Sequence, residues 1–290
     1  MSATSGFHRI LLATDGSDAA AAAVETVIAI VKGRPAEVRV VHVWNLEVHH
    51  RHGHLDVEVR SEARDLVEAT VGRLRAAGIQ AAGEIMRADH EHVPSAITSA
   101  AREFEPDLLV VGSRGLTEWQ SIVRHSVSHQ LLTALDCPIL IVRGRPLGNA
   151  ETAPRVLLAV AGGEDVAPVV RAAIAAAGRL GSKVQVVHVA QVVIGLQGFV
   201  LAETDGEAQA TVAAALALLN DAGIPAEGVI THKGPVAEAI AEVAQTWNAD
   251  VIVTGSSRTG DLTSLALGSV SRHLMRTTVR PVLIAERVLS

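Results

Sequence analysis

The stretch Arg9-Ile-Leu-Leu-Ala-Thr-Asp15 decides the fold class, because it returns 146 residues later as Arg155-Val-Leu-Leu-Ala-Val-Ala161. The same offset separates Val38-Arg-Val-Val-His-Val43 from Val184-Gln-Val-Val-His-Val189. Two further pairs of matching segments are residues 106–113 with 249–256 and residues 137–142 with 280–285. Segments that match in the same order at a nearly constant offset indicate an internal duplication.

We therefore predict two copies of one domain, over residues 1–143 and residues 154–290. The total length of 290 residues suits two domains of ordinary size. Residues 144–153 are polar and interrupted by Gly and Pro, which is typical of a linker.

Each copy alternates short aliphatic runs with longer Ala-rich amphipathic stretches. In the first copy these stretches are residues 17–31, 58–77, 93–104 and 126–135. Continuous Val, Ile and Leu runs are typical of strands buried on both faces, and their alternation with helices indicates a parallel sheet. We predict an α/β fold in which each copy is a doubly wound, flavodoxin- or Rossmann-like sheet. Each copy would have five strands in the order 3-2-1-4-5 and four helices on both faces.

The composition excludes several kinds of partner. Aromatic residues make up 2% of the chain and the formal net charge is −6. A protein that stacks single-stranded bases needs exposed rings, and one that binds a phosphate backbone or an acidic membrane needs clustered Lys and Arg. We therefore expect neither a nucleic acid nor a membrane as partner. The single cysteine, Cys137, and the lack of a signal-like or membrane-spanning segment predict a cytoplasmic protein.

A ligand site is predicted beyond the carboxyl ends of the strands, where the winding of the sheet reverses. Asp15 closes the first strand, and the fourth strand opens into Gly112-Ser-Arg-Gly115. A second small-residue cluster, Ser126-Val-Ser128, begins a helix. A Gly-rich loop and a helix N-terminus hold anions through backbone N–H groups. Since the Asp15 carboxylate would repel phosphate, we expect it to face a base or a sugar.

These segments resemble the universal stress protein family. Its ATP-binding members carry Gly-x-x-Gly, nine residues and then Gly-Ser or Gly-Thr, with an Asp at the end of strand one. The resemblance spans nearly all of both copies. It implies a non-enzymatic stress-response regulator that binds an adenine nucleotide, ATP in the first instance, mainly in the first domain. The positions that would touch the nucleotide are Ala13, Asp15, Val43, Gly112, Ser113, Arg114, Gly115, His125, Ser126, Val127, Ser128, Gly255, Gly268 and Ser269.

Neither copy has the complete motif. In the first copy His125 replaces the third glycine, which the family uses where phosphates approach the backbone closely. In the second copy Arg258 replaces the second glycine, and Ala161 stands where the first copy has Asp15. Gly255, Gly268 and Ser269 are retained there. These departures favour the first copy as the nucleotide site.

Simpler interpretations of the same residues stay open. Asp15 could cap the following helix or hold its loop by an Asx-turn. Ser126 and Ser269 stand where helix N-caps are expected without any ligand. The His-rich residues 49–54 are interpreted as a solvated loop, because no Cys or paired acidic residues accompany them at a metal-site spacing. We predict no metal site and no catalytic residue.

The sequence is also compatible with two functions other than a nucleotide-binding regulator. The broken motifs suit a ligand-free scaffold that acts through protein contacts. A weak ATPase or nucleotidyl transferase is the other alternative, for which no metal-binding carboxylate pair is found. The resemblance also implies that the last strands, residues 139–142 and 282–285, associate edge to edge as an intramolecular pseudo-dimer of domains. A homodimer of chains is the other way to pair these edges.

Overall fold

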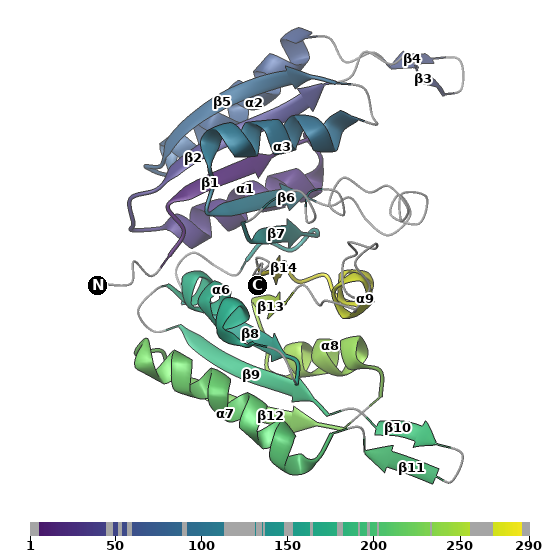
Figure 1. The fold of residues 1–290 in the computed structure, drawn as a ribbon. Coiled ribbons are helices and arrows are strands. Elements are labelled where there is room, and N and C mark those ends of the chain that lie inside the picture. Colours follow the sequence, from purple (N-terminus) through teal and green to yellow (C-terminus); the bar gives the residue numbers. More distant parts are fainter. Residues whose placement is uncertain are drawn as a thin grey trace. The chain divides into compact units, whose positions relative to one another are not determined.

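The chain forms two compact units, residues 7–146 and residues 147–290, which are described separately (Figure 1). The computed structural model describes residues 6–44, 49–51, 54–56, 60–88, 92–112, 131, 135, 137–147, 153–162, 165–178, 182–190, 192–195, 198–201, 203–232, 234–255 and 269–285. Within these residues, no helix is long and apolar enough to cross a membrane.

The first unit is a parallel sheet in the order β5-β2-β1-β6-β7. Its strands are β1 (Arg9–Ala13), β2 (Glu37–Trp44), β5 (Gln80–Arg87), β6 (Leu108–Gly112) and β7 (Ile139–Val142). Its described helices are α1 (Asp18–Val31), α2 (Arg60–Ala76) and α3 (Val93–Phe104). Helix α1 packs on β6 and β7 and contacts α2, whereas α3 lies across β1 and β2 on the opposite face (Figure 1).

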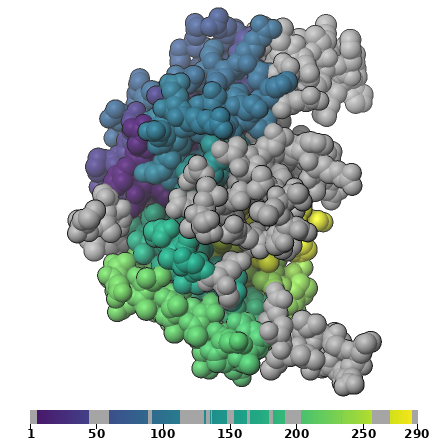
Figure 2. Space-filling view, viewed as in Figure 1, coloured from purple at the N-terminus to yellow at the C-terminus, as the bar shows by residue number. Residues whose placement is uncertain are grey.

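The second unit repeats this arrangement in the order β12-β9-β8-β13-β14. Its strands are β8 (Arg155–Val160), β9 (Lys183–Val189), β12 (Ala226–Thr231), β13 (Val251–Thr254) and β14 (Val282–Ile284). Its described helices are α6 (Ala167–Ala177), α7 (Asp205–Asp221), α8 (Val236–Thr246) and α9 (Ser269–Thr277). The predicted strand order 3-2-1-4-5 is confirmed in both units. Helix α7 lies at the surface of the second unit (Figure 2).

Each unit also has a short antiparallel hairpin after its second strand. In the first unit β3 (His49–Arg51) pairs with β4 (His54–Asp56), and in the second β10 (Val192–Gly195) pairs with β11 (Gly198–Leu201). The interpretation of residues 49–54 as a solvated loop is wrong where β3 and β4 pair. The strands have only three or four residues, too few to give a readable alternation of apolar and polar positions.

The core is mostly aliphatic. Ile10, Leu11 and Leu12 of β1 are fully buried, because the sheet is covered on both faces. Leu157 and Ile252 have the same environment in the second unit, where they pack with helices α8 and α9.

One acidic residue braces the amino end of the sheet in each unit. In the first, the Asp107 carboxylate accepts hydrogen bonds from the backbone N–H groups of His8, at 2.7 Å, and Arg9, at 3.0 Å. In the second, Asp250 accepts one from the Arg155 N–H at 2.9 Å. Burial raises the pKa of Asp107 above its ordinary value, although both hydrogen bonds oppose that shift. This brace ties the first and fourth strands together at the end opposite to the predicted site.

An arginine stacks on an aromatic ring at the same end of each unit. The Arg9 guanidinium lies 4.6 Å from the centre of the Phe104 ring, and that of Arg155 lies 4.7 Å from Trp247. Such cation–π contacts hold the first strand of each unit in the same position relative to the aromatic ring.

Candidate functional site

The loop after β1 is held by its own side chains. Ser17 is the N-cap of α1 and accepts a hydrogen bond from the Ala20 N–H at 3.3 Å. Oδ1 of Asp15 in turn accepts from the Ser17 N–H at 3.0 Å and from its hydroxyl at 2.6 Å. Gly16 has a φ of +76°, a conformation that favours glycine. The Asx-turn considered from the sequence is therefore present, and it orients a solvent-exposed carboxylate at the carboxyl end of β1.

A buried histidine of β2 holds this loop by a hydrogen bond to its backbone. His42 of β2 is 4% exposed, and its Nδ1 lies 2.7 Å from the Thr14 carbonyl oxygen. Since a carbonyl only accepts, Nδ1 carries the proton and donates it. Ala13 and Val43 are half-buried where β1 and β2 end. The structure thus brings Ala13, Asp15 and Val43, three of the positions predicted to touch the nucleotide, together at the carboxyl ends of β1 and β2.

Gly112, at the end of β6, is required by packing. A Cβ atom on this residue would lie 2.5 Å from the backbone nitrogen of Ala20 and 2.7 Å from the carbonyl carbon of Ala19. The first turn of α1 therefore approaches the strand so closely that only glycine fits. From the sequence this glycine is interpreted only as part of a phosphate loop, because the approach of α1 is a tertiary contact without a local signal.

The predicted phosphate side of the site is formed by residues 112–115 and 125–128 of the first copy and Gly268 of the second. Ser113, Arg114, Gly115, His125, Ser126, Val127, Ser128 and Gly268 lie outside the described residues. Their role in nucleotide binding stays a prediction. In the described part of the chain, no group of three or more His, Cys, Asp or Glu side chains is placed to hold a metal ion.

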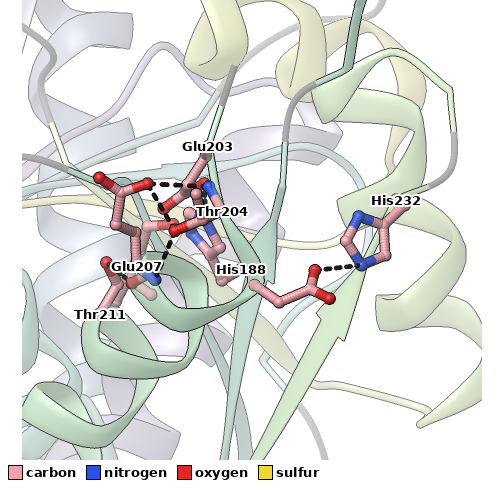
Figure 3. A network of polar contacts seen from close by, with 8 residues as sticks. His188, Glu203, Thr204, Glu207, Thr211 and His232 are labelled. Carbon is pink, nitrogen blue, oxygen red and sulfur yellow. Dashed lines mark hydrogen bonds and ion pairs between the residues drawn. The ribbon is translucent and has the colours of Figure 1, made fainter. Parts of the chain in front are cut away.

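In the second unit a different residue brings a carboxylate to the end of strand one. Ala161, which follows β8, carries no carboxylate. Glu203 lies just before α7, and its side chain reaches Gly162, the residue after Ala161. A Cβ atom on Gly162 would lie 2.6 Å from Oε1 of Glu203, so the carboxylate occupies the space that glycine leaves open. The other oxygen, Oε2, lies 2.6 Å from Nε2 of His188 (Figure 3). Nδ1 of that histidine donates to the Val160 carbonyl at 2.9 Å, as His42 does in the first unit.

A capping box fixes the segment that carries Glu203. The Thr204 hydroxyl accepts from the Glu207 N–H at 3.3 Å, and the Glu207 carboxylate accepts from the Thr204 N–H at 2.8 Å (Figure 3). Hydrogen bonds from the Thr204 backbone and hydroxyl lower the pKa of Glu207. The Thr-x-x-Glu pattern is a recognisable helix start and is the one sequence signal that would have placed Glu203 immediately before a helix.

Gly255, at the end of β13, has surroundings unlike those of Gly112. Among the residues that the structure describes, no atom lies within 4 Å of where its Cβ would be. Its carbonyl accepts a hydrogen bond at 3.3 Å from the hydroxyl of Ser271, a buried residue of α9. Ser269 is the first residue of α9, close to its predicted place at the start of that helix.

The chain is similar to known proteins in both halves. The model of the universal stress protein family matches residues 6–143 and again residues 153–286. Universal stress protein YxiE of Bacillus subtilis is 31% identical over 150 residues, which are 47% of this chain and 99% of that protein.

Two universal stress proteins are among the solved structures that match nearly the whole chain. A universal stress protein from Archaeoglobus fulgidus superposes with a TM-score of 0.72 at 23% identity, over 97% of this chain and 98% of that one. A putative universal stress protein from Pseudomonas aeruginosa gives a TM-score of 0.63 at 15% identity, over 97% and 94%. At these identities the superpositions show the fold, and together with the two family matches they establish that the chain belongs to the universal stress protein family, with two family domains in tandem.

Proposed function

We propose that the first unit binds an adenine nucleotide beyond the carboxyl ends of β1, β2 and β6, and that the protein is a non-enzymatic stress-response regulator controlled by this occupancy. The observation that carries the proposal is the exposed carboxylate of Asp15, held by Ser17 beside the point where the sheet reverses its winding. Ligands of doubly wound sheets bind at this point.

The chemistry of this edge suits a nucleoside better than a bare phosphate. A carboxylate accepts hydrogen bonds from a ribose hydroxyl or a base amino group and repels phosphate. Ala13 and Val43 offer small aliphatic surfaces at the same edge. In this proposal the phosphates lie on the other side, at the Gly-rich residues 112–115 and at residues 126–128, where the sequence predicts a helix start whose backbone N–H groups would hold them.

The test begins with the full-length protein purified without added ligand. Mass spectrometry identifies any nucleotide that copurifies, and calorimetry measures the affinity for ATP, AMP and cyclic dinucleotides. Asp15→Ala is expected to weaken binding at least about tenfold, since a hydrogen bond to a charged group contributes roughly 1.5–3 kcal/mol. Asp18→Ala removes an equal charge three residues away and serves as the matched control. No copurified nucleotide and no heat with any of these ligands would contradict the proposal.

The ligand-free scaffold is the second candidate, and His125 is the residue that favours it. An imidazole stands where the family motif has its third glycine. If His125→Gly restores no affinity for ATP, the scaffold is supported over the nucleotide regulator. Sustained ATP turnover that is lost in Asp15→Ala would instead support the enzymatic alternative. Cytoplasmic location, the pairing of the two domains and a homodimer of chains stay predictions.

A further inference from the structure

The amino ends of the two sheets differ in charge, although an aspartate braces both. In the first unit Arg9 of β1 lies opposite Glu37 of β2, with Nη1 of Arg9 at 3.5 Å from Oε2 of Glu37. In the second unit the same register places Arg155 of β8 opposite Lys183 of β9, the strand beside it (Figure 1). Opposite charges at facing positions of two strands attract, whereas like charges repel. The carboxylate that accompanies the arginine in the first unit is therefore replaced by a second positive charge.

The Arg155 guanidinium lacks the acceptors that Arg9 has. Nε of Arg9 donates to the Phe104 carbonyl at 3.2 Å, whereas Nε of Arg155 is buried and has no hydrogen-bond acceptor among the described residues. In the same part of the chain, neither Arg155 nor Lys183 forms an ion pair with an acidic side chain. The guanidinium stacks on the Trp247 ring. Because a donor left without an acceptor is unfavourable and a guanidinium matches the geometry of a carboxylate, this arginine favours a carboxylate supplied from outside the unit.

The acidic side chains nearest to Arg155 are engaged in other contacts. Asp250 accepts the hydrogen bond from the Arg155 N–H, and Asp107 plays the same part in the first unit. Asp250 therefore does not account for the difference between the two units. On β12, Oε1 of Glu227 accepts a hydrogen bond from Nε2 of Gln185 at 2.9 Å. In the described part of the chain, the facing cations of β8 and β9 are thus left without a carboxylate of their own.

The residues beside this pair suit a contact with protein. Arg280 adds a positive charge, and its Nε donates to the Ala249 carbonyl at 2.6 Å. Ala249 comes two residues after Trp247, so this guanidinium is anchored next to the segment on which Arg155 stacks. Val279, which precedes Arg280, is 62% exposed. Arg and Trp are the residues on which protein interfaces most often depend, and a free anion has no apolar atoms for an exposed valine to contact. These features favour a peptide over a free anion.

We propose that the amino end of the second sheet is a docking surface for an acidic segment of a partner protein. A carboxylate of the partner takes the place beside Arg155 and Lys183 that Glu37 occupies in the first unit. Apolar atoms of the partner contact Trp247 and Val279. This surface lies at the ends of the strands opposite to the nucleotide site proposed above, and it does not depend on that function.

The test measures binding of a short fluorescein-labelled peptide of glutamates and leucines to the full-length protein, by fluorescence anisotropy at low ionic strength. The same peptide with glutamine in place of glutamate is expected to bind at least about tenfold more weakly. Lys183→Glu rebuilds the opposite-charge pair of the first unit within the second, and it is expected to weaken binding of the acidic peptide at least about tenfold. Lys32→Glu makes the same change at an exposed position of the first unit and should leave the affinity within about twofold.

Two measurements separate docking from effects on the fold. Lys183→Glu removes a like-charge contact, so it should unfold at the same or a higher urea concentration than the wild type. Nuclear magnetic resonance follows the Arg155 guanidinium, whose signal is identified by its absence in Arg155→Lys, and this signal should shift on addition of the acidic peptide.

Three results would overturn the docking surface. They are equal affinity for the glutamate and glutamine peptides, equal losses in Lys183→Glu and Lys32→Glu, and an unchanged Arg155 signal at saturating peptide. A fourth result concerns the class of ligand. If inorganic phosphate displaces the peptide where acetate at the same concentration does not, the surface binds phosphate and the assignment to an acidic protein segment is wrong.

Discussion

The two units place an acid at the end of their first strand by different means. In the first, Asp15 belongs to the loop after β1 and is oriented by a residue two positions away. In the second, Glu203 reaches the loop after β8 from the start of α7 and is oriented by a buried histidine of β9. The strand order of the sheet is the same in both units. The fold therefore sets the position of the carboxylate, at the carboxyl end of strand one, but does not determine which element supplies it.

The largest expected difference between the units concerns the glycines that end β6 and β13. In Gly112→Ala the new methyl group meets the backbone of α1, which cannot move away as the end of a side chain can. We expect a loss of about 3 kcal/mol or more, at the upper end for overpacked cores. Gly255→Ala has no described neighbour to meet and should change the free energy of unfolding by less than about 0.5 kcal/mol. Urea unfolding of both variants makes the comparison, and equal losses would contradict it.

The buried histidines are expected to give the next largest effect. His42→Phe and His188→Phe each remove the donor to a backbone carbonyl, at Thr14 and Val160, and each should cost about 1–3 kcal/mol. In the second unit the loss should be partly recovered in the double variant His188→Phe, Glu203→Leu, because that change removes both partners of the buried pair. Denaturant unfolding of the double-mutant cycle measures the recovery, and strictly additive losses would show that the two residues do not interact.

Removing the N-cap of α1, next to Asp15, and that of α7, next to Glu203, should destabilise the two units to a similar degree. Ser17 caps α1 and Thr204 caps α7, each through a side-chain oxygen that accepts a backbone N–H. Ser17→Ala and Thr204→Ala are each expected to destabilise their unit by about 1 kcal/mol. Hydrogen exchange of the first-turn amides, with Thr211→Ala at a half-buried position further along α7 as the control, localises the effect. Unchanged exchange in the first turn would exclude a capping role.

The smallest expected effect is a difference of sign in the pH dependence of stability. The pKa of Glu207 is lowered, so its contribution is present above the ordinary value of 4.5 and is lost as the pH falls through its folded-state pKa. The pKa of Asp107 is raised, so its unfavourable contribution is present above its folded-state pKa and disappears as the pH falls to the ordinary value of 3.8. Unfolding of Glu207→Gln and Asp107→Asn across this acidic range should therefore deviate from wild type in opposite directions. Deviations of the same sign would be inconsistent with these shifts.

The sequence predicts the sheets better than the sites, for physical reasons. Strands such as β1 and β8 are buried on both faces, and this leaves continuous aliphatic runs that can be recognised without any partner. The contact between His188 and Glu203 joins two elements through their packing, and neither residue is unusual in its own segment. The same holds for Gly112, whose need for glycine comes from the backbone of α1. Asp15 was identified because its position after a buried strand is itself a local feature.

The brace at the amino end of each sheet has an evolutionary consequence. Asp107 and Asp250 hold the first strand of their unit by backbone hydrogen bonds, on the edge opposite to the candidate sites. The contacts that maintain the architecture and the site proposed for nucleotide recognition thereby lie at opposite ends of the strands of one sheet. After the duplication, each copy could change the residues at the carboxyl ends of its strands while the brace at the amino ends kept the strands aligned, which left the two domains free to diverge at their candidate sites.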